Sequence, residues 1–163
     1  MKQVKQSVIV NRSNFKGGTL EVPGDKSISH RVAILAAMAS GESKVRNFLT
    51  CEDCLNTLHA MEALGARTSF SESGELSIRG TAGRLIQPAG QLDCGNSGTA
   101  MRLLAGVISG LPMTTELSGD ASLNSRPMGR IKEPLEKMGA RIELLGPNGC
   151  APMRIQGGGL KEI

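Results

Sequence analysis

One order of structural elements occurs twice in this chain, and this internal duplication constrains the fold more than any single motif does. Each copy is predicted to run strand, apolar helix, strand, amphipathic helix, strand, strand. Gly24 and Arg31 in the first copy fall on Gly95 and Arg102 in the second, 71 residues later. The sequence therefore predicts an α+β fold built from two βαβαββ units.

The first copy covers about residues 19–80 and is expected to contain a buried helix after a short strand. Its predicted elements are a strand at 19–22, a helix at 27–39, a strand at 43–48, a helix from 52 or 53 to 64, and a strand pair at 67–71 and 75–79. The first helix is apolar nearly all round, which is typical of a buried helix. Ser73 and Gly74 predict a hairpin turn between the last two strands. Residues 1–18 are expected to form a strand at 4–10 and a polar connector.

The second copy covers about residues 90–157 and repeats this order. Its predicted elements are a strand near Leu92, a helix at 99–108, a strand at 114–118, a polar loop at 119–127, an amphipathic helix and a final strand pair. The sequence Gly-Ala-Arg at 65–67 returns at 139–141, and each of these glycines is expected to end a helix. Pro134 would break a helix interior, so we expect the fourth helix to kink there or to begin late.

The composition favours a globular protein that binds small anions. Hydrophobic residues make up 39% of the chain and charged residues 21%, and no apolar run is long enough to span a bilayer, so we expect a soluble, cytoplasmic protein without membrane contact. The net charge of +4 suits acidic ligands, but aromatic residues are only 2%, which leaves little on which nucleic-acid bases could stack. We therefore expect no nucleic-acid partner. The four cysteines are predicted to be reduced thiols, and no second pair follows Cys51 and Cys54 to complete a zinc site.

Glycine-rich turns precede both apolar helices and predict two anion-binding sites. The first, G-D-K-S-I-S-H-R at 24–31, places Lys26 and Arg31 where the backbone N–H groups and the dipole of a helix already favour an anion. The second, G-N-S-G at 95–98, opens a helix in which Arg102 is surrounded by apolar residues. If the two helices pack side by side, both turns point toward one edge of the molecule.

Several polar residues near these turns have a structural alternative. The structural alternative for Asp25 or Ser27 is to cap the first helix, and the structural alternative for Asp53 is to open the second one. His30 is expected to be a packing or hydrogen-bonding residue. From the loop at 119–127, Arg126 is expected to face the shared edge, because its planar guanidinium suits bidentate binding of a phosphate or carboxylate.

Three motifs carry a resemblance to a known enzyme family. They are P-G-D-K-S-I-S-H-R at 23–31, G-N-S-G-T-A-M-R at 95–102 and G-D-A-S-L-N-S-R-P-M at 119–128. With them the chain resembles the enolpyruvyl transferases, and among these the 5-enolpyruvylshikimate-3-phosphate (EPSP) synthases. The resemblance implies an inside-out α/β barrel, or prism, in which each of two globules contains three repeated units and the substrates bind between the globules. It implies that this chain is an N-terminal fragment, with residues 19–163 forming part of one globule and residues 1–18 leading toward the other.

The resemblance also implies a reaction and a set of site residues. The enolpyruvyl group of phosphoenolpyruvate would pass to the 5-hydroxyl of shikimate 3-phosphate with release of phosphate, in the shikimate pathway of aromatic amino acid biosynthesis, without a metal or organic cofactor. Lys26, Ser27 and Arg31 match residues that hold shikimate 3-phosphate, and Lys26 is expected to assist proton transfer. The residues expected to bind phosphoenolpyruvate are Lys26, Asn96, Gly98, Arg102 and Arg126. Without the missing C-terminal part, the chain is expected to be inactive.

Two alternatives remain open from the sequence. The related UDP-N-acetylglucosamine enolpyruvyl transferases share the architecture but have Asn in the first motif where Lys-Ser-x-Ser-x-Arg stands here. An autonomous phosphate-binding module would use the same helix starts without chemistry. Leu103 stands where many EPSP synthases have Pro, and variation around this helix affects how tightly the family holds glyphosate, a mimic of phosphoenolpyruvate.

Overall fold

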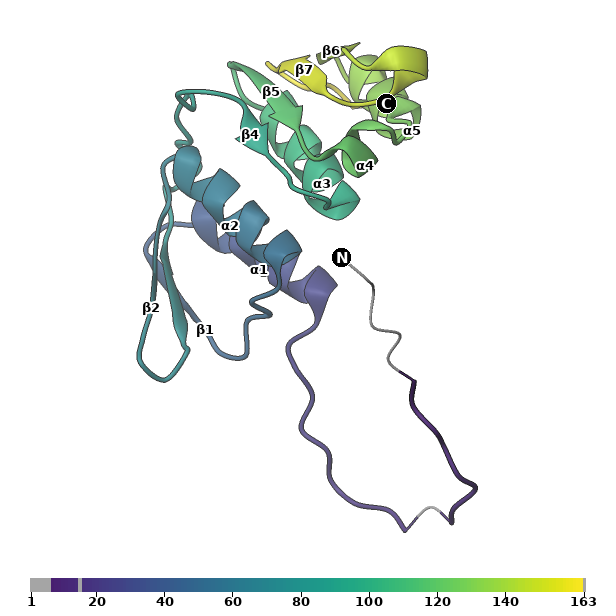
Figure 1. Cartoon of the computed structure of the whole chain (residues 1–163). Helices are drawn as coiled ribbons and strands as arrows, with labels where there is room; N and C mark the ends of the chain where they lie inside the picture. Colours follow the sequence, from purple (N-terminus) through teal and green to yellow (C-terminus); the bar gives the residue numbers. More distant parts are fainter. Residues whose placement is uncertain (1–6, 15, 163) are drawn as a thin grey trace.

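The computed structural model describes residues 7–14 and 16–162 and has an α+β fold (Figure 1). Its first unit contains α1 (Lys26–Met38), β1 (Glu42–Val45), α2 (Glu52–Ala63), β2 (Arg67–Phe70) and β3 (Leu76–Arg79). The strands form an antiparallel sheet in the order β1-β3-β2. The predicted hairpin between the last two strands is confirmed, with Gly74 at a φ of 79° in its turn.

The second unit repeats this plan with one more strand. It contains β4 (Leu92–Asp93), α3 (Gly98–Ser109), β5 (Thr114–Ser118), α4 (Ala121–Asn124), α5 (Gly129–Lys137), β6 (Arg141–Leu144), the 3-10 turn η1 (Pro147–Gly149) and β7 (Met153–Gln156). The sheet order is β4-β5-β7-β6, and β4 pairs with β5 in parallel. The order β5-β7-β6 therefore matches β1-β3-β2 of the first unit.

The helices α1, α2 and α3 lie between the two sheets in Figure 1 and share one hydrophobic core. The largest fully buried side chains come from both units; they include Leu58, Met61, Ile78, Met101, Leu104 and Met153. Within the described residues, no helix is both long and apolar enough to cross a membrane. Burial of these apolar side chains is the main stabilising contribution to the fold.

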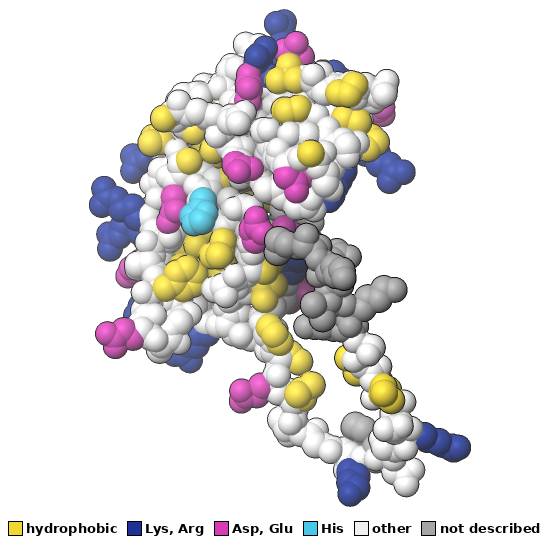
Figure 2. All heavy atoms as spheres, in the orientation of Figure 1, with side chains coloured by type: hydrophobic (Ala, Val, Ile, Leu, Met, Phe, Trp, Pro, Cys, Tyr) yellow, Lys and Arg dark blue, Asp and Glu magenta, His cyan; other side chains and the backbone are white. Residues whose placement is uncertain are grey.

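The prediction of a strand at 19–22 is wrong, because no ladder forms there. These residues belong to an arm, described at 7–14 and 16–25, that extends from the rest of the molecule and has solvent-exposed apolar side chains (Figures 1 and 2). Leu20 is 83% exposed. Asn47 Nδ2, in the loop after β1, donates a 3.4 Å hydrogen bond to Val22 O. In the predicted strand at 4–10, residues 4–6 lie outside the described residues, and residues 7–10 form no strand.

Two further predictions are corrected, and one of two alternatives is excluded. The helix at 27–39 is only partly buried, because no described residue covers the face that carries Ile28, 61% exposed, and Leu35, 66% exposed. The loop at 119–127 contains the helical turn α4, which Asp120 caps by accepting a 2.7 Å hydrogen bond from Leu123 N. For the fourth helix, α5, the alternative of a late start is excluded, since Pro134 lies inside it and not in its first turn.

Both two-faced helices end in the same Schellman motif, as the repeated Gly-Ala-Arg sequence predicts. Gly65 has a φ of 108° and Gly139 a φ of 112°. Gly65 N donates to Glu62 O and Gly139 N donates to Glu136 O, at 2.9 and 3.0 Å. These are positions at which a residue with a Cβ atom is strained.

We expect Gly139→Ala to destabilise the fold by roughly 1–2 kcal/mol, the cost of a left-handed backbone for an L-residue with a side chain. Urea unfolding of the chain measures this change. Gly106→Ala is the control, because Gly106 lies inside α3 with no atom within 4 Å of an added Cβ, and alanine there should add about 0.5–1 kcal/mol of stability. Equal stability of the two variants would contradict the Schellman assignment.

Candidate functional site

The first helix start places Lys26 beside a carboxylate. Asp25 caps α1 by accepting a 2.7 Å hydrogen bond from Ile28 N, which is the structural role considered for it. Lys26, the first residue of α1, forms an ion pair with Asp53 of α2 and is 51% exposed. The hydrogen bond with Asp53 raises the pKa of Lys26, although partial desolvation opposes the shift. Lys26 is therefore an ammonium group at neutral pH.

Asp53 is a site residue that the sequence did not reveal. It lies in the first turn of α2, as predicted, but its carboxylate also faces α1 and holds Lys26. Its neighbour Glu52 is exposed. The rotation of α2 against α1 decides which of these two carboxylates reaches the lysine. The sequence pattern does not predict that rotation.

The second helix start brings two arginines together over a glycine. Ser97 caps α3 by accepting a hydrogen bond from Ala100 N at 3.1 Å. Arg102 Nη1 donates to Gly98 O at 3.0 Å, one turn earlier in the helix. A Cβ atom placed on Gly98 would lie 2.6 Å from Arg102 Nη1 and 3.1 Å from Arg126 Nη1. Both guanidinium groups therefore converge on the same point at the start of α3.

Side-chain amides and hydroxyls orient Arg126. Its Nη2 donates to Asn96 Oδ1 at 2.6 Å, and Asn96 Nδ2 donates to Asp120 Oδ2 at 2.7 Å. The hydrogen bond from Asn96 lowers the pKa of Asp120, which stays a carboxylate. Among residues 7–14 and 16–162, neither Arg102 nor Arg126 has a carboxylate within 4 Å of its guanidinium nitrogens. Two cations at a helix N-terminus without such a counterion form an anion-binding site.

The first turn of α2 connects the two helix starts. A Cβ atom on Gly95 would overlap Asn56 Nδ2 and would lie 4.0 Å from Glu52 Oε1, so the glycine-rich turn packs directly against this turn of α2. The same turn carries Asp53, which holds Lys26. Figure 1 shows the starts of α1 and α3 on the same side of the molecule. The predicted shared edge therefore exists, with Lys26 on one part of it and the arginines on the other.

Comparison with known proteins identifies the family. The family described as EPSP synthase (3-phosphoshikimate 1-carboxyvinyltransferase) matches residues 11–163. The chain belongs to the EPSP synthase family. It is 55% identical to the 3-phosphoshikimate 1-carboxyvinyltransferase of Akkermansia muciniphila over 90% of this chain and 35% of that protein. It is 49% identical to the enzyme of the same name from Koribacter versatilis over 97% of this chain and 36% of that protein.

The structure of EPSP synthase from Acinetobacter baumannii is similar to this fold, with a TM-score of 0.84 at 45% sequence identity. The similarity covers 90% of this chain and 33% of that one. The chain thus spans about a third of the length of the relatives it matches. The family membership and the α+β architecture expected from the sequence are confirmed.

The remaining residues that resemble EPSP synthase site residues lie along α1. Ser27 and Arg31 are exposed, and Arg31 Nη1 donates to Ser27 O at 3.0 Å. Arg31 also lines a hollow between α1 and α3 together with Leu103. Leu103 is therefore a packing residue between the two helices of this EPSP synthase homologue.

The cysteines near the EPSP synthase motif are packing residues. Cys54 Sγ lies 3.6 Å from Lys26 O, to which it donates, and burial raises the pKa of this thiol to about 12. Cys54 is therefore a thiol at neutral pH. The described part of the chain contains no group of three or more histidines, cysteines and acidic residues that could hold a metal ion.

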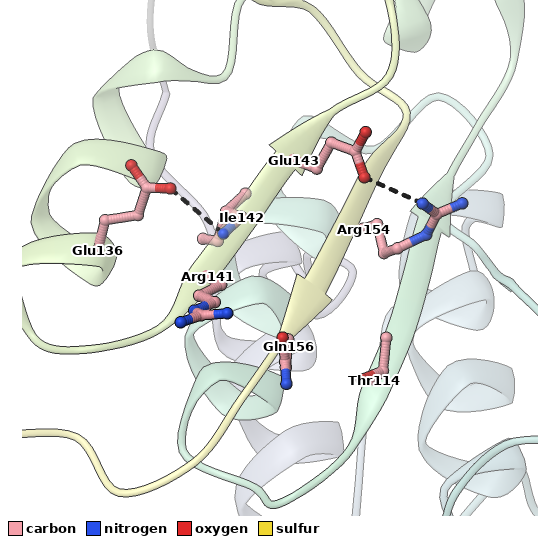
Figure 3. A pocket seen from close by; sticks show the side chains of 7 residues that line it. All are labelled: Thr114, Glu136, Arg141, Ile142, Glu143, Arg154 and Gln156. Atoms are coloured by element: carbon pink, nitrogen blue, oxygen red, sulfur yellow. Dashed lines mark hydrogen bonds and ion pairs between the residues drawn. The ribbon is translucent and has the colours of Figure 1, made fainter.

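A second hollow lies on the outer face of the sheet β4-β5-β7-β6, away from the EPSP synthase motifs (Figure 3). Its lining residues are Thr114, Glu136, Arg141, Ile142, Glu143, Arg154 and Gln156. Arg154 pairs with Glu143 at 3.0 Å and with Glu116 at 2.7 Å, so its charge is compensated. Thr114 is the first residue of β5. The loop that lies beside Gly95 follows the last residue of the same strand. The hollow and the arginine cluster are therefore at opposite ends of β5.

We expect Asp53→Asn to lower the pKa of Lys26 toward that of an unpaired lysine. A raised lysine pKa means that the ion pair stabilises the fold at neutral pH and that this contribution is lost as pH rises through the folded-state pKa of the lysine. Titration of Lys26 13Cε by NMR measures the change. Glu75→Gln is the control, because Glu75 pairs with Lys44 and Arg46 instead. An unchanged Lys26 titration in Asp53→Asn would contradict the pairing.

We expect Gly98→Ala to weaken the binding of inorganic phosphate about tenfold or more while the melting temperature stays near that of the wild type. The added Cβ displaces the flexible ends of Arg102 and Arg126, and a charged hydrogen bond contributes about 1.5–3 kcal/mol. Amide shifts of the chain on phosphate titration give both affinities. Gly90→Ala, where an added Cβ has no atom within 4 Å, is the control. Unchanged phosphate affinity in Gly98→Ala would place the anion elsewhere.

Proposed function

We propose that the protein containing this chain transfers the enolpyruvyl group of phosphoenolpyruvate to the 5-hydroxyl of shikimate 3-phosphate, releasing phosphate. The observation that carries this proposal is the convergence of Arg102 and Arg126 over Gly98 without a carboxylate among the described residues within salt-bridge distance. The relatives are named 3-phosphoshikimate 1-carboxyvinyltransferase, which describes the same activity. The part of the relatives that lies beyond this chain would supply the other side of the site.

The residues have separate roles in this proposal. Arg102 and Arg126 bind the anionic groups of phosphoenolpyruvate, while Asn96 fixes the guanidinium of Arg126. Lys26 lies between the two substrates, donates hydrogen bonds as an ammonium group and assists proton transfer. Fixed cations of this kind offset the repulsion between two phosphorylated acids and stabilise charge that develops in the transition state.

Shikimate 3-phosphate would bind along the exposed side of α1. Ser27 and Arg31 lie one turn apart there, and both are accessible. Ser27 is the second residue of α1, in the first turn, whose N–H groups favour a phosphate. The family's reaction requires neither a metal nor an organic cofactor.

The two units would form part of an inside-out barrel whose helices are central and whose sheets are outside. The matching strand orders and the paired Schellman motifs support this proposal. Residues 1–18 would lead toward a second globule, and residues 19–163 would form two of the units of the first. The four free thiols favour the reducing environment of the cytoplasm.

We expect Lys26→Met and Arg126→Ala to lower kcat/KM by roughly a hundredfold or more, the usual cost of removing one oriented charge donor. The assay uses this chain fused to the C-terminal two thirds of the Akkermansia muciniphila relative, with phosphate release as the readout. Arg154→Ala is the matched control, since Arg154 is bound to two carboxylates on the sheet. Wild-type rates in both site variants would overturn the assignment, and phosphate binding without turnover in the fusion would favour a binding module.

A further inference from the structure

A buried polar link joins α1 to α2 directly beneath the site. His30 in α1 and Thr57 in α2 are both fully buried, and His30 Nδ1 lies 2.7 Å from Thr57 Oγ1. Thr57 Oγ1 donates in turn to Asp53 O at 3.3 Å, one turn earlier in α2. A hydroxyl has a single proton to donate, so Nδ1 carries the proton of the first hydrogen bond. The link therefore runs from His30 through Thr57 to the residue that holds Lys26.

This link has an energetic cost. Burial lowers the pKa of His30, and the nearby charges of Lys26 and Arg31 lower it further against the opposing effect of Asp53, so the imidazole is neutral. Its Nε2 is buried and has no hydrogen-bond partner among the described residues. A buried polar atom without a partner destabilises a fold relative to an apolar group of the same size. Packing alone would therefore be served better by an apolar side chain.

The second unit shows that apolar side chains do serve at the equivalent places. At the offset of 71 between the apolar helices, His30 corresponds to Met101, which is fully buried. At the offset of 74 between the two-faced helices, Thr57 corresponds to Ile131, which packs against the core. At the same offset, Asp53 corresponds to a proline, Pro127. The polar pair thus occurs in the unit that has a carboxylate at the position of Asp53, and the apolar pair in the unit that has a proline there.

We propose that His30 and Thr57 are positioning residues, which fix the first turn of α2 against α1 so that the Asp53 carboxylate stays on the Lys26 ammonium. The hydrogen bond between His30 Nδ1 and Thr57 Oγ1 ties α2 to α1 one turn from Asp53 and opposes rotation of α2 about its axis. That rotation decides whether Asp53 or Glu52 faces α1. Cys54 Sγ, 3.6 Å from Lys26 O, adds a contact in the same place. The effect of this link on turnover rests on the proposed function, but its effect on Lys26 does not.

The test converts the first unit into the second at these two positions. In the chain carrying His30→Met and Thr57→Ile, we expect the pKa of Lys26, followed by 13Cε NMR, to fall relative to the wild type while the cooperative thermal transition is kept. Thr57→Val, nearly the same size as threonine, gives a second version if the double variant does not fold. Thr57→Ser keeps the hydroxyl and should give the wild-type titration of Lys26.

The control is Ser109→Ala, which removes a buried hydroxyl of α3 that is outside the link and should leave the Lys26 titration unchanged. In the active fusion described above, the double variant should lower kcat roughly tenfold, as expected for a misplaced catalytic group, with Thr57→Ser near the wild type. A Lys26 titration that is identical in the wild type, the double variant and Thr57→Val would overturn the proposal. An inactive fusion would count against the proposed function alone, because the Lys26 titration does not depend on it.

Discussion

The site depends on holding like charges close together before any ligand is present. Arg102 and Arg126 repel each other over Gly98, and the positive end of the α3 dipole adds to this repulsion. Neutral groups, Gly98 O and the Asn96 amide, hold the two guanidinium groups in place. The positive charges of the two guanidinium groups stay uncompensated, because the hydrogen bonds orient the cations without neutralising them. An anion with two or more charged oxygens would compensate both charges.

The duplicated units perform different tasks on the same scaffold. Their helix caps, their Schellman glycines and the order of three strands agree, so packing and backbone geometry are common to both. Their charges differ, because the cation of the first unit, Lys26, is paired with Asp53, whereas Arg102 of the second has no carboxylate within reach among the described residues. Duplication therefore supplies the two helix starts, and the substitutions between the copies determine what each start binds.

The sequence predicted what depends on local chemistry and repetition. The helix ends lie within about one residue of the structure for α1, α2 and α3, since caps and glycines define them. The strand expected at 19–22 failed because a strand needs a neighbour, which local propensity does not provide. Ion pairs such as Lys26 with Asp53 also escaped prediction, because they depend on how two helices are rotated against each other. The roles assigned to the site residues all stay predictions; these residues are Lys26, Ser27, Arg31, Asn96, Gly98, Arg102 and Arg126.

The difference in charge pairing gives the two parts of the site different responses to an incoming anion. At the arginines, an anion gains electrostatic energy without displacing a carboxylate, so this part has the stronger attraction for the first ligand. At Lys26, a ligand must share the ammonium with Asp53, and the three donors of a lysine allow this only in a restricted geometry. In the proposed function, Asp53 would thereby make binding at Lys26 selective for a ligand that approaches from the side opposite the carboxylate. A rotation of α2 would change the directions from which a ligand can reach Lys26, and the buried link through Thr57 opposes that rotation.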